Sequence, residues 1–294
     1  STMNALVEWD AQLALAVRTH NWLLLAWRII VYLLLVIGGF LFMVPALWMI
    51  TTAFKTLTES QSFPPVWIPT EIQLSNFTQP FIDLPFARFY SNTLTITLFN
   101  LIGVILSCTP VAYAFARFNF RFRQPLLLSF LITNAFPRFG LYVSIAIVFF
   151  RLGLVGTIPG VILIQIVNTL LLMIWIPTSA FQNVDRALEE AALDVGASRL
   201  RVFWQITLPM VFPSLAAALL LTFVNTFYES QGALLIGVPN VRTMPVLMYQ
   251  YINNQIVVQY GAVISLLLWL PSLVLLTFAQ RFLRGNAVAA GFGV

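Results

Sequence analysis

Five long intervals of the sequence contain no Asp, Glu, Lys or Arg, and each is long enough to cross a lipid bilayer as a helix. These intervals lie between residues 28 and 55, 88 and 117, 151 and 185, 201 and 229, and 242 and 281. About 20 apolar residues span the ~30 Å hydrocarbon core of a membrane. A sixth apolar stretch, 125–149, is interrupted by Pro137 and Arg138. Long apolar runs without alternation favour helices over a closed barrel.

The predicted fold class is therefore an all-α membrane protein with six transmembrane helices. The predicted spans are 29–53, 90–116, 125–149, 153–179, 209–229 and 260–283. Composition agrees, because 60% of the residues are hydrophobic and only 9% are charged, against about 25% charged in soluble domains. We expect an N-terminal cytoplasmic or interfacial segment over 1–27, a membrane domain over 28–284 and a cytoplasmic tail over 285–294.

The basic residues predict how the chain is oriented. Ten lie on one predicted side: Arg18, Arg28, Arg117, Arg121, Arg123, Arg186, Arg199, Arg201, Arg281 and Arg284. Four lie on the other: Lys55, Arg88, Arg151 and Arg242. Because Lys and Arg concentrate in cytoplasmic loops, we expect both termini and the fourth connection, about 181–208, in the cytoplasm. The net charge of +5 is thus explained by membrane orientation, and no nucleic-acid partner is expected.

The fourth connection is predicted to form two short amphipathic helices joined sharply at Gly196. Asp185 and Ser198 are suitable N-caps because their side chains accept hydrogen bonds from unpaired backbone amides. Gly196 can adopt the left-handed conformation that ends a helix, and Pro209 should end or kink the second helix. Apolar residues recur at helical spacing in the first helix, at Leu188, Ala191, Ala192 and Val195. The alternative interpretation of the charged residues in this helix is a solvent-exposed face with no binding role.

The spacing within this connection resembles the signature of binding-protein-dependent importer permeases of the ATP-binding-cassette (ABC) type. Glu190-Ala191-Ala192 is followed after three residues by Gly196 and after nine more by Ile206-x-Leu208-Pro209. Further likeness to the second permease subunit of the maltose-type carbohydrate branch is carried by WIP at 67–69, FYSNT at 89–93, AYAFAR at 112–117, RTMP at 242–245 and QRFLRG at 280–285. The chain departs from that branch at 227–230, where FYES replaces its usual WNEF.

The resemblance implies a type I ABC importer permease whose fourth connection contacts a separate ATPase. The implied partners are a second permease forming a heterodimer, two ATPase subunits and an external or periplasmic binding protein, in a bacterial or archaeal cytoplasmic (inner) membrane. The coupling residues would be Glu189, Glu190, Ala191, Ala192, Leu193, Asp194 and Gly196. Leu193 is expected to contact the ATPase cleft. ATP and Mg²⁺ would bind the partner, because this chain lacks a Gly-rich phosphate loop ending in Lys-Ser or Lys-Thr.

Three residues at membrane depth are candidates for the substrate pathway: Arg138, Asn225 and Glu229. An Arg at the bilayer centre costs about 2.5–3.5 kcal/mol, so it should face a cavity, a partner or the surface. Pro137 removes an amide donor and is expected to break the helix there. Arg138 could contact substrate, or it could form a structural ion pair with Glu229.

The predicted substrate is a saccharide, and an acidic oligosaccharide would best explain an Arg in the pathway. A polyol or polyamine importer, or a secondary-transporter subunit, is the alternative. An enzyme is not expected, because the single His20 lies outside the spans and the acids do not pair within them. With one Cys and one His, no disulfide and no metal site built from these residue types is expected.

Overall fold

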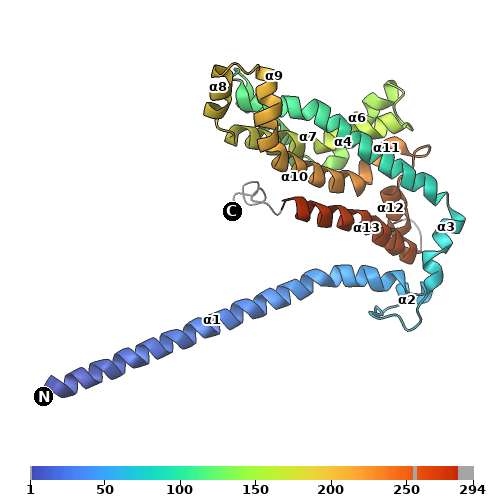
Figure 1. The fold of residues 1–294 in the computed structure, drawn as a ribbon. Coiled ribbons are helices and arrows are strands. Elements are labelled where there is room, and N and C mark those ends of the chain that lie inside the picture. Colours follow the sequence, from blue (N-terminus) through green and yellow to red (C-terminus); the bar gives the residue numbers. More distant parts are fainter. Residues whose placement is uncertain (1, 254–256, 284–294) are drawn as a thin grey trace.

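The computed structural model describes the backbone of residues 2–253 and 257–283, with side chains for residues 22, 24–82, 84–253 and 257–278, and its regular elements are all helical. Figure 1 shows a bundle of helices from which α1 projects as a long arm. The elements are α1 (Thr2–Ala53), α2 (Leu57–Ser60), a 3₁₀ turn η1 (Leu74–Phe77), α3 (Gln79–Asp83), α4 (Phe86–Arg117), α5 (Arg123–Ala135), α6 (Arg138–Arg151), α7 (Ile158–Asn183), α8 (Arg186–Asp194), α9 (Arg199–Val202), a π-helix η2 (Phe203–Thr207), α10 (Leu208–Phe227), α11 (Gln231–Gly237), α12 (Met244–Asn253) and α13 (Val258–Leu283).

Five helical segments in the described part of the chain are long and apolar enough to cross a membrane, and a bent helix pair adds a sixth. The pair is α5 and α6, whose axes differ by 106° at the break between Ala135 and Arg138. Pro137 occupies the N-cap position of α6, and its missing amide removes a helical hydrogen bond. The predicted break at Pro137 is therefore confirmed.

The bent pair carries the chain from one end of the bundle to the other. The guanidinium of Arg117, which ends α4, donates to the carbonyl of Val184 just after α7, so α4 and α7 end on the same side. The connection between them must return across the bundle before α7 begins. α5 lies beside the second half of α7, where the Trp175 indole donates to Leu127 O at 3.2 Å. α6 lies beside its first half, where Tyr142 joins an apolar cluster. The fold thus has six spans, as predicted.

The core lies between α4, α7 and α10, and α13 joins it near the opposite end from α8. α1 packs mainly on α13, through Ala53 against Ala262 and Val263. Most of the apolar segment Leu24–Ala53 that precedes this contact is exposed in the isolated chain. The predicted boundary at residue 27 falls inside this continuous helix, and the predicted tail 285–294 lies outside the described residues.

The connection between α1 and α4 folds tightly around Lys55. The Asn76 side-chain amide donates to Ala53 O at 3.0 Å and to Lys55 O at 2.8 Å. The Lys55 side chain is fully buried, and its ammonium lies 3.5 Å from the centre of the Trp48 ring. Burial lowers the pKa of Lys55, while the charge of Glu59 opposes this change. The ring face attracts the cation and offsets part of its desolvation.

The helix directions generate a test of topology. α4 and α7 end beside α8, whereas the connection 54–85 lies at the other end of the bundle (Figure 1). In a Cys108→Ala background, a membrane-impermeant thiol reagent should label a cysteine at exposed Gln73 in intact cells. A cysteine at exposed Ser198 should react only after the membrane is permeabilised. Labelling of position 198 but not of position 73 in intact cells would reverse the orientation.

Candidate coupling and translocation sites

The α8–α9 segment forms the two capped helices and the sharp joint that the sequence predicts. A carboxylate oxygen of Asp185 accepts from the amide of Ala187 at 2.9 Å, which caps α8. The Ser198 hydroxyl accepts from the amide of Arg201 at 3.3 Å and caps α9. Between them Gly196 has φ +91°. A residue with a side chain is strained at that φ. The backbone conformation at position 196, and not a lack of space around it, therefore favours glycine.

The two adjacent acids of α8 face different surroundings. Glu189 is turned inward: its carboxylate lies 2.7 Å from the Arg117 guanidinium at the end of α4, with only 15% of the Glu189 side chain and 8% of the Arg117 side chain exposed. The same oxygen, Oε1, accepts from the Thr207 hydroxyl at 2.6 Å. This is the single ion pair found among the described residues. Glu190 and Asp194, by contrast, are exposed.

The apolar stripe of α8 points away from the rest of the chain. Leu188 is 48% exposed and Val195 is 85% exposed, and Ala191 is exposed as well. Of the predicted stripe, Ala192 alone is partly buried. A helix of a free-standing domain would turn such a stripe to its own core, so this stripe is available to another subunit. Leu193 is 38% exposed and lies on the side of the groove described below; its contact with an ATPase stays a prediction.

The second helix continues past Pro209 into the membrane span, so of the two outcomes predicted for Pro209, an end or a kink, the end does not occur. Instead, the five residues Phe203–Thr207 form a π-helix, in which the amide of Leu208 donates to Phe203 O. Pro209 has no amide to donate to the carbonyl four residues earlier. A wider π turn accommodates this loss without ending the helix, and such turns occur frequently at functional sites. The Leu208-Pro209 end of the signature thus changes the helical register.

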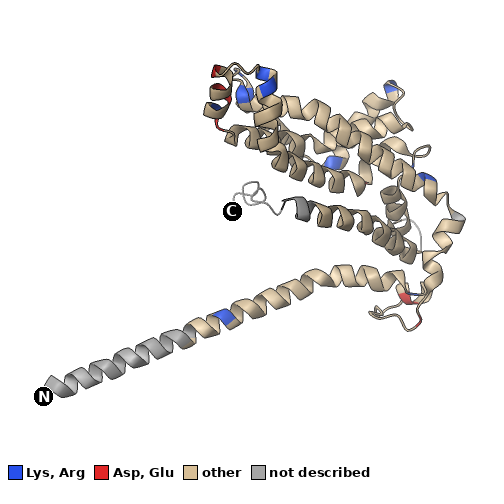
Figure 2. Ribbon diagram, in the orientation of Figure 1, with Lys and Arg blue, Asp and Glu red and all other residues tan. Residues whose placement is uncertain are grey.

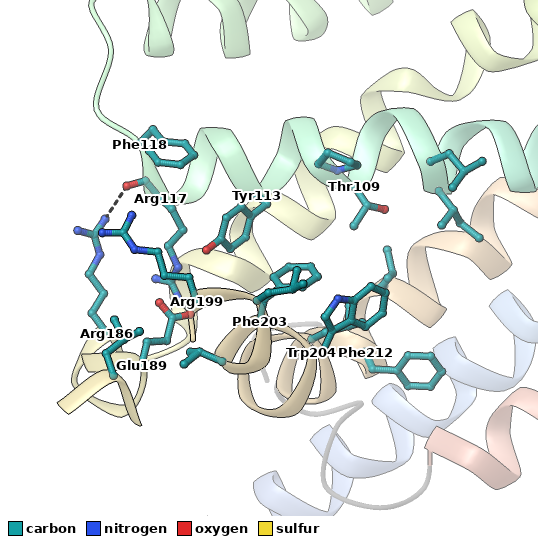
Figure 3. A pocket seen from close by; sticks show the side chains of 18 of the residues that line it. Thr109, Tyr113, Arg117, Phe118, Arg186, Glu189, Arg199, Phe203, Trp204 and Phe212 are labelled. Carbon is teal, nitrogen blue, oxygen red and sulfur yellow. Dashed lines mark hydrogen bonds and ion pairs between the residues drawn. The ribbon is translucent and has the colours of Figure 1, made fainter. Parts of the chain in front are cut away.

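A groove of about 970 Å³ lies between α4 and α9–α10, with α8 at one end. Figure 3 shows Arg117, Arg186, Glu189 and Arg199 gathered at that end, while Thr109, Trp204 and Phe212 lie further along. The charges of the molecule follow the same division: Figure 2 shows Arg and Glu concentrated around α8 and α9 and largely absent from the spans. The groove is therefore apolar along the spans and charged at the α8 end.

Glu229, just beyond the end of α10, serves as a structural acceptor. Its two carboxylate oxygens accept from the Gln165 side-chain amide at 2.6 Å and from the backbone amides of Gly232 and Ala233 at 2.7 and 3.1 Å. These bonds join α7 to the first turn of α11. Arg138 is exposed at the start of α6 and makes no ion pair with Glu229. The structure thus does not show the ion pair that was the structural alternative for Arg138.

Asn225 lies next to the side-chain amide of Asn168, a residue that the sequence analysis did not single out. The Asn168 side chain of α7 donates to Asn225 Oδ1 of α10 at 2.9 Å, and both are partly exposed. The signal available in the sequence was the presence of Gln165 and Asn168 inside a charge-free run, because polar groups in a span need partners or a cavity. Within the described residues, no three His, Cys, Asp or Glu side chains are grouped to hold a metal ion.

Comparison with known proteins places this geometry in a family. Residues 108–285, which include α7, α8, the π-helix and α10, match the model of the family described as "Binding-protein-dependent transport system inner membrane component". The chain belongs to this family. The matched region is more than half of the 294 residues. It contains the signature and both candidate sites.

Curated relatives and solved structures agree with the family. The chain is 30% identical over 220 residues to the sulfoquinovosyl glycerol transport system permease protein SmoH of Agrobacterium fabrum, covering 74% of this chain and 76% of that protein. It is 32% identical over 208 residues to the maltose/maltodextrin transport system permease protein MalG of Yersinia pestis, covering 68% of each. A bacterial ABC transporter involved in the import of the acidic polysaccharide alginate has a similar fold, with TM-score 0.66, 19% identity, and coverage of 86% and 95%.

The hydrogen bonds of Glu229 generate a second prediction. Arg138→Met should leave the thermal stability of the purified protein close to that of the unchanged chain, because Arg138 is exposed and makes no ion pair among the described residues. Glu229→Gln should lower it, because a carboxamide presents only one acceptor oxygen in place of two. The two effects should add within about 0.5 kcal/mol, as for residues that do not interact. A double-mutant coupling energy above that value in a chemical unfolding series would show that the two charges interact.

Proposed function

We propose that this chain is the transmembrane permease subunit of an ABC importer for a saccharide, and that acidic saccharides are its preferred class. The observation that carries the proposal is the α8–α9 segment: a capped helix with a largely exposed apolar stripe and a left-handed glycine joint, in a chain of the permease family. The relative named for maltose supports a saccharide substrate, and the relative named for sulfoquinovosyl glycerol and the fold of an alginate importer support an acidic one.

The uncovered surfaces support a multi-subunit assembly. α8 would insert its Leu188–Val195 stripe into a cleft of a separate ATPase, which would bind ATP and Mg²⁺. The bare apolar face of α1 and the groove side of α4 and α10 would meet lipid or a second permease, which would complete the pathway. A periplasmic or external binding protein would deliver the saccharide at the end that carries the 54–85 connection. The excess of basic residues at the α8 end supports a cytoplasmic location for both termini.

Asn168, Asn225 and Arg138 are the proposed contacts for substrate. The two amides keep hydrogen-bonding capacity beyond the single bond that joins them, since a carboxamide offers two donors and an acceptor with two lone pairs. Such groups suit sugar hydroxyls. Arg138 begins α6 at the break in the span, without an ion-pair partner among the described residues. A guanidinium in that position matches a carboxylate on a sugar, because its fork of donors binds carboxylates in a bidentate manner.

Reconstitution tests the function directly. Proteoliposomes containing this chain with its co-purified permease and ATPase should take up a uronic-acid oligosaccharide only when ATP and the binding protein are supplied. Arg138→Met should reduce uptake at least tenfold, because a charge-assisted pair contributes about 1.5–3 kcal/mol, while assembly and ATP hydrolysis stay normal. Arg151→Met, at the other end of α6, is the matched control and should transport normally. Uptake without ATP would indicate a secondary transporter, and normal uptake by Arg138→Met would remove Arg138 from the pathway.

The exposed stripe of α8 gives a separate prediction about assembly. Val195→Asp should weaken co-purification of the ATPase, because truncating or charging a central interface residue costs about 2 kcal/mol or more. Leu193→Asp tests the residue expected from the sequence, which lies on the groove side. Gly196→Val should impair coupling through its φ of +91°. If Val195→Asp retained full ATPase binding while Leu193→Asp lost it, the docking face would be the groove side of α8 instead.

A further inference from the structure

Three segments that are distant in the sequence meet at one carboxylate oxygen beside α8. Glu189 Oε1 accepts both from Arg117 Nη2 at 2.7 Å and from the Thr207 hydroxyl at 2.6 Å. These residues come from α8, from the end of α4 and from the π-helix that leads into α10. Arg117 also donates twice to Val184 O, at 3.2 Å, which adds the end of α7. We call Arg117, Glu189 and Thr207 the Glu189 cluster.

The cluster is sheltered from water and rests on packed aromatic rings. Thr207 is 1% exposed, and the Arg117 side chain is 8% exposed. Beneath them the Tyr113 ring of α4 makes edge contacts with Phe181 of α7 at 5.3 Å and with Phe203 of the π-helix at 5.2 Å. Buried ion pairs are screened by salt much less than exposed ones, and close-packed interiors transmit displacement. The connection is therefore stiff.

The walls of the groove are packed together at its base, where Tyr113 of α4 contacts Phe203 and residues of α4 and α10 share one apolar cluster, and they part along its open side. The groove of about 970 Å³ separates the side chains of α4 from those of α9 and α10 next to the cluster, and Figure 3 shows Arg117 and Glu189 at its end. A displacement of α8 can therefore reach both α4 and the start of α10 through the Glu189 cluster. The π turn ends at Thr207, so the cluster holds α10 at the point where its helical register changes.

We propose that the Glu189 cluster is the joint that transmits movement of α8 into α4 and α10. Glu189 is a positioning residue: it does not contact an ATPase or substrate but fixes α8 to the two spans that flank the groove. Its neighbour Glu190 is exposed, so adjacent acids have separate tasks, one inside the chain and one toward the partner. The inference rests on the proposed coupling role of α8.

Two nearly isosteric substitutions test the joint, in the complete complex with its ATPase and second permease. Glu189→Gln keeps the side-chain shape and removes the ion pair, and Thr207→Val removes only the hydroxyl donor. Thr222→Val is the matched control, because Thr222 lies fully buried in α10 and its hydroxyl has no hydrogen-bond partner. Each complex is assayed for ATPase co-purification, for ATP hydrolysis and for the distance between spin labels at exposed positions Leu106 of α4 and Leu200 of α9.

We expect Glu189→Gln and Thr207→Val complexes to assemble and to hydrolyse ATP within about twofold of the unchanged complex. The nucleotide-dependent change in label distance should be lost or broadened in both, and saccharide uptake per ATP should fall about tenfold for Glu189→Gln. Thr222→Val should behave like the unchanged complex. If Glu189→Gln lowers the yield of the complex, the measurements on the Thr207→Val complex alone test the proposed joint. An unaltered nucleotide-dependent distance change in assembled Thr207→Val complex, with uptake per ATP also unaltered, would overturn the proposal.

The distance measurement separates this inference from the proposed substrate. If the unchanged complex moved with nucleotide but transported no saccharide, the substrate assignment would fail and the joint could still be judged. If the labels in the unchanged complex did not respond to nucleotide at all, the coupling role of α8 would fail, and the inference with it. A loss of the distance change restricted to the two cluster variants supports the joint alone.

Discussion

Hydrocarbon offers no hydrogen bonds to a peptide group, and this constraint determines the architecture of the chain. Each span must pair its own backbone, so helices are the available solution. Two of the places where a proline interrupts the helical hydrogen bonds show how the constraint is met. At Pro137 the chain bends by 106° and begins a new helix. At Pro209 it widens into a π turn that keeps the amide of Leu208 bonded. The first interruption places Arg138 at a helix start, and the second places Thr207 against Glu189.

Within lipid, apolar contact alone gives helices little reason to associate, so packing and polar contacts hold the bundle. Amide and hydroxyl pairs connect α7 and α4 to α10: Asn168 with Asn225, and Asn100 with Thr226 at 2.7 Å. Glu229 extends this set by joining Gln165 of α7 to α11. Glu229 is thereby used for structure, whereas Arg138 makes no ion pair among the described residues. The candidate pathway lies at Asn168 and Asn225, whose side-chain amides have donors that these contacts do not use.

Under the proposed function, the two sides of α8 have different roles. The exposed stripe is the proposed surface for another subunit, and the sheltered Glu189 joins that helix to the spans. A permease that hydrolyses no ATP itself must receive work mechanically, and a flexible attachment would absorb the displacement. The ion pair, the hydroxyl bond and the aromatic contacts beneath them remove that flexibility. The docking face and the membrane pathway therefore belong to one mechanical unit under the proposed function.

The sequence by itself determined the six spans, the break at Pro137 and the capped helices around Gly196, because each follows from local properties: span length, a missing amide, or a side chain that caps its own helix. It also placed the chain in its family through the spacing from Glu190 to Pro209. Only the tertiary structure decided that Glu229 bonds Gln165 and not Arg138, that Leu188 and Val195 face outward, and that Glu189 meets Arg117 across 72 positions of sequence. Those outcomes depend on which helix faces are brought together. Hydropathy does not reveal which face of a membrane helix is buried in the protein, because lipid and the protein interior both accept apolar side chains.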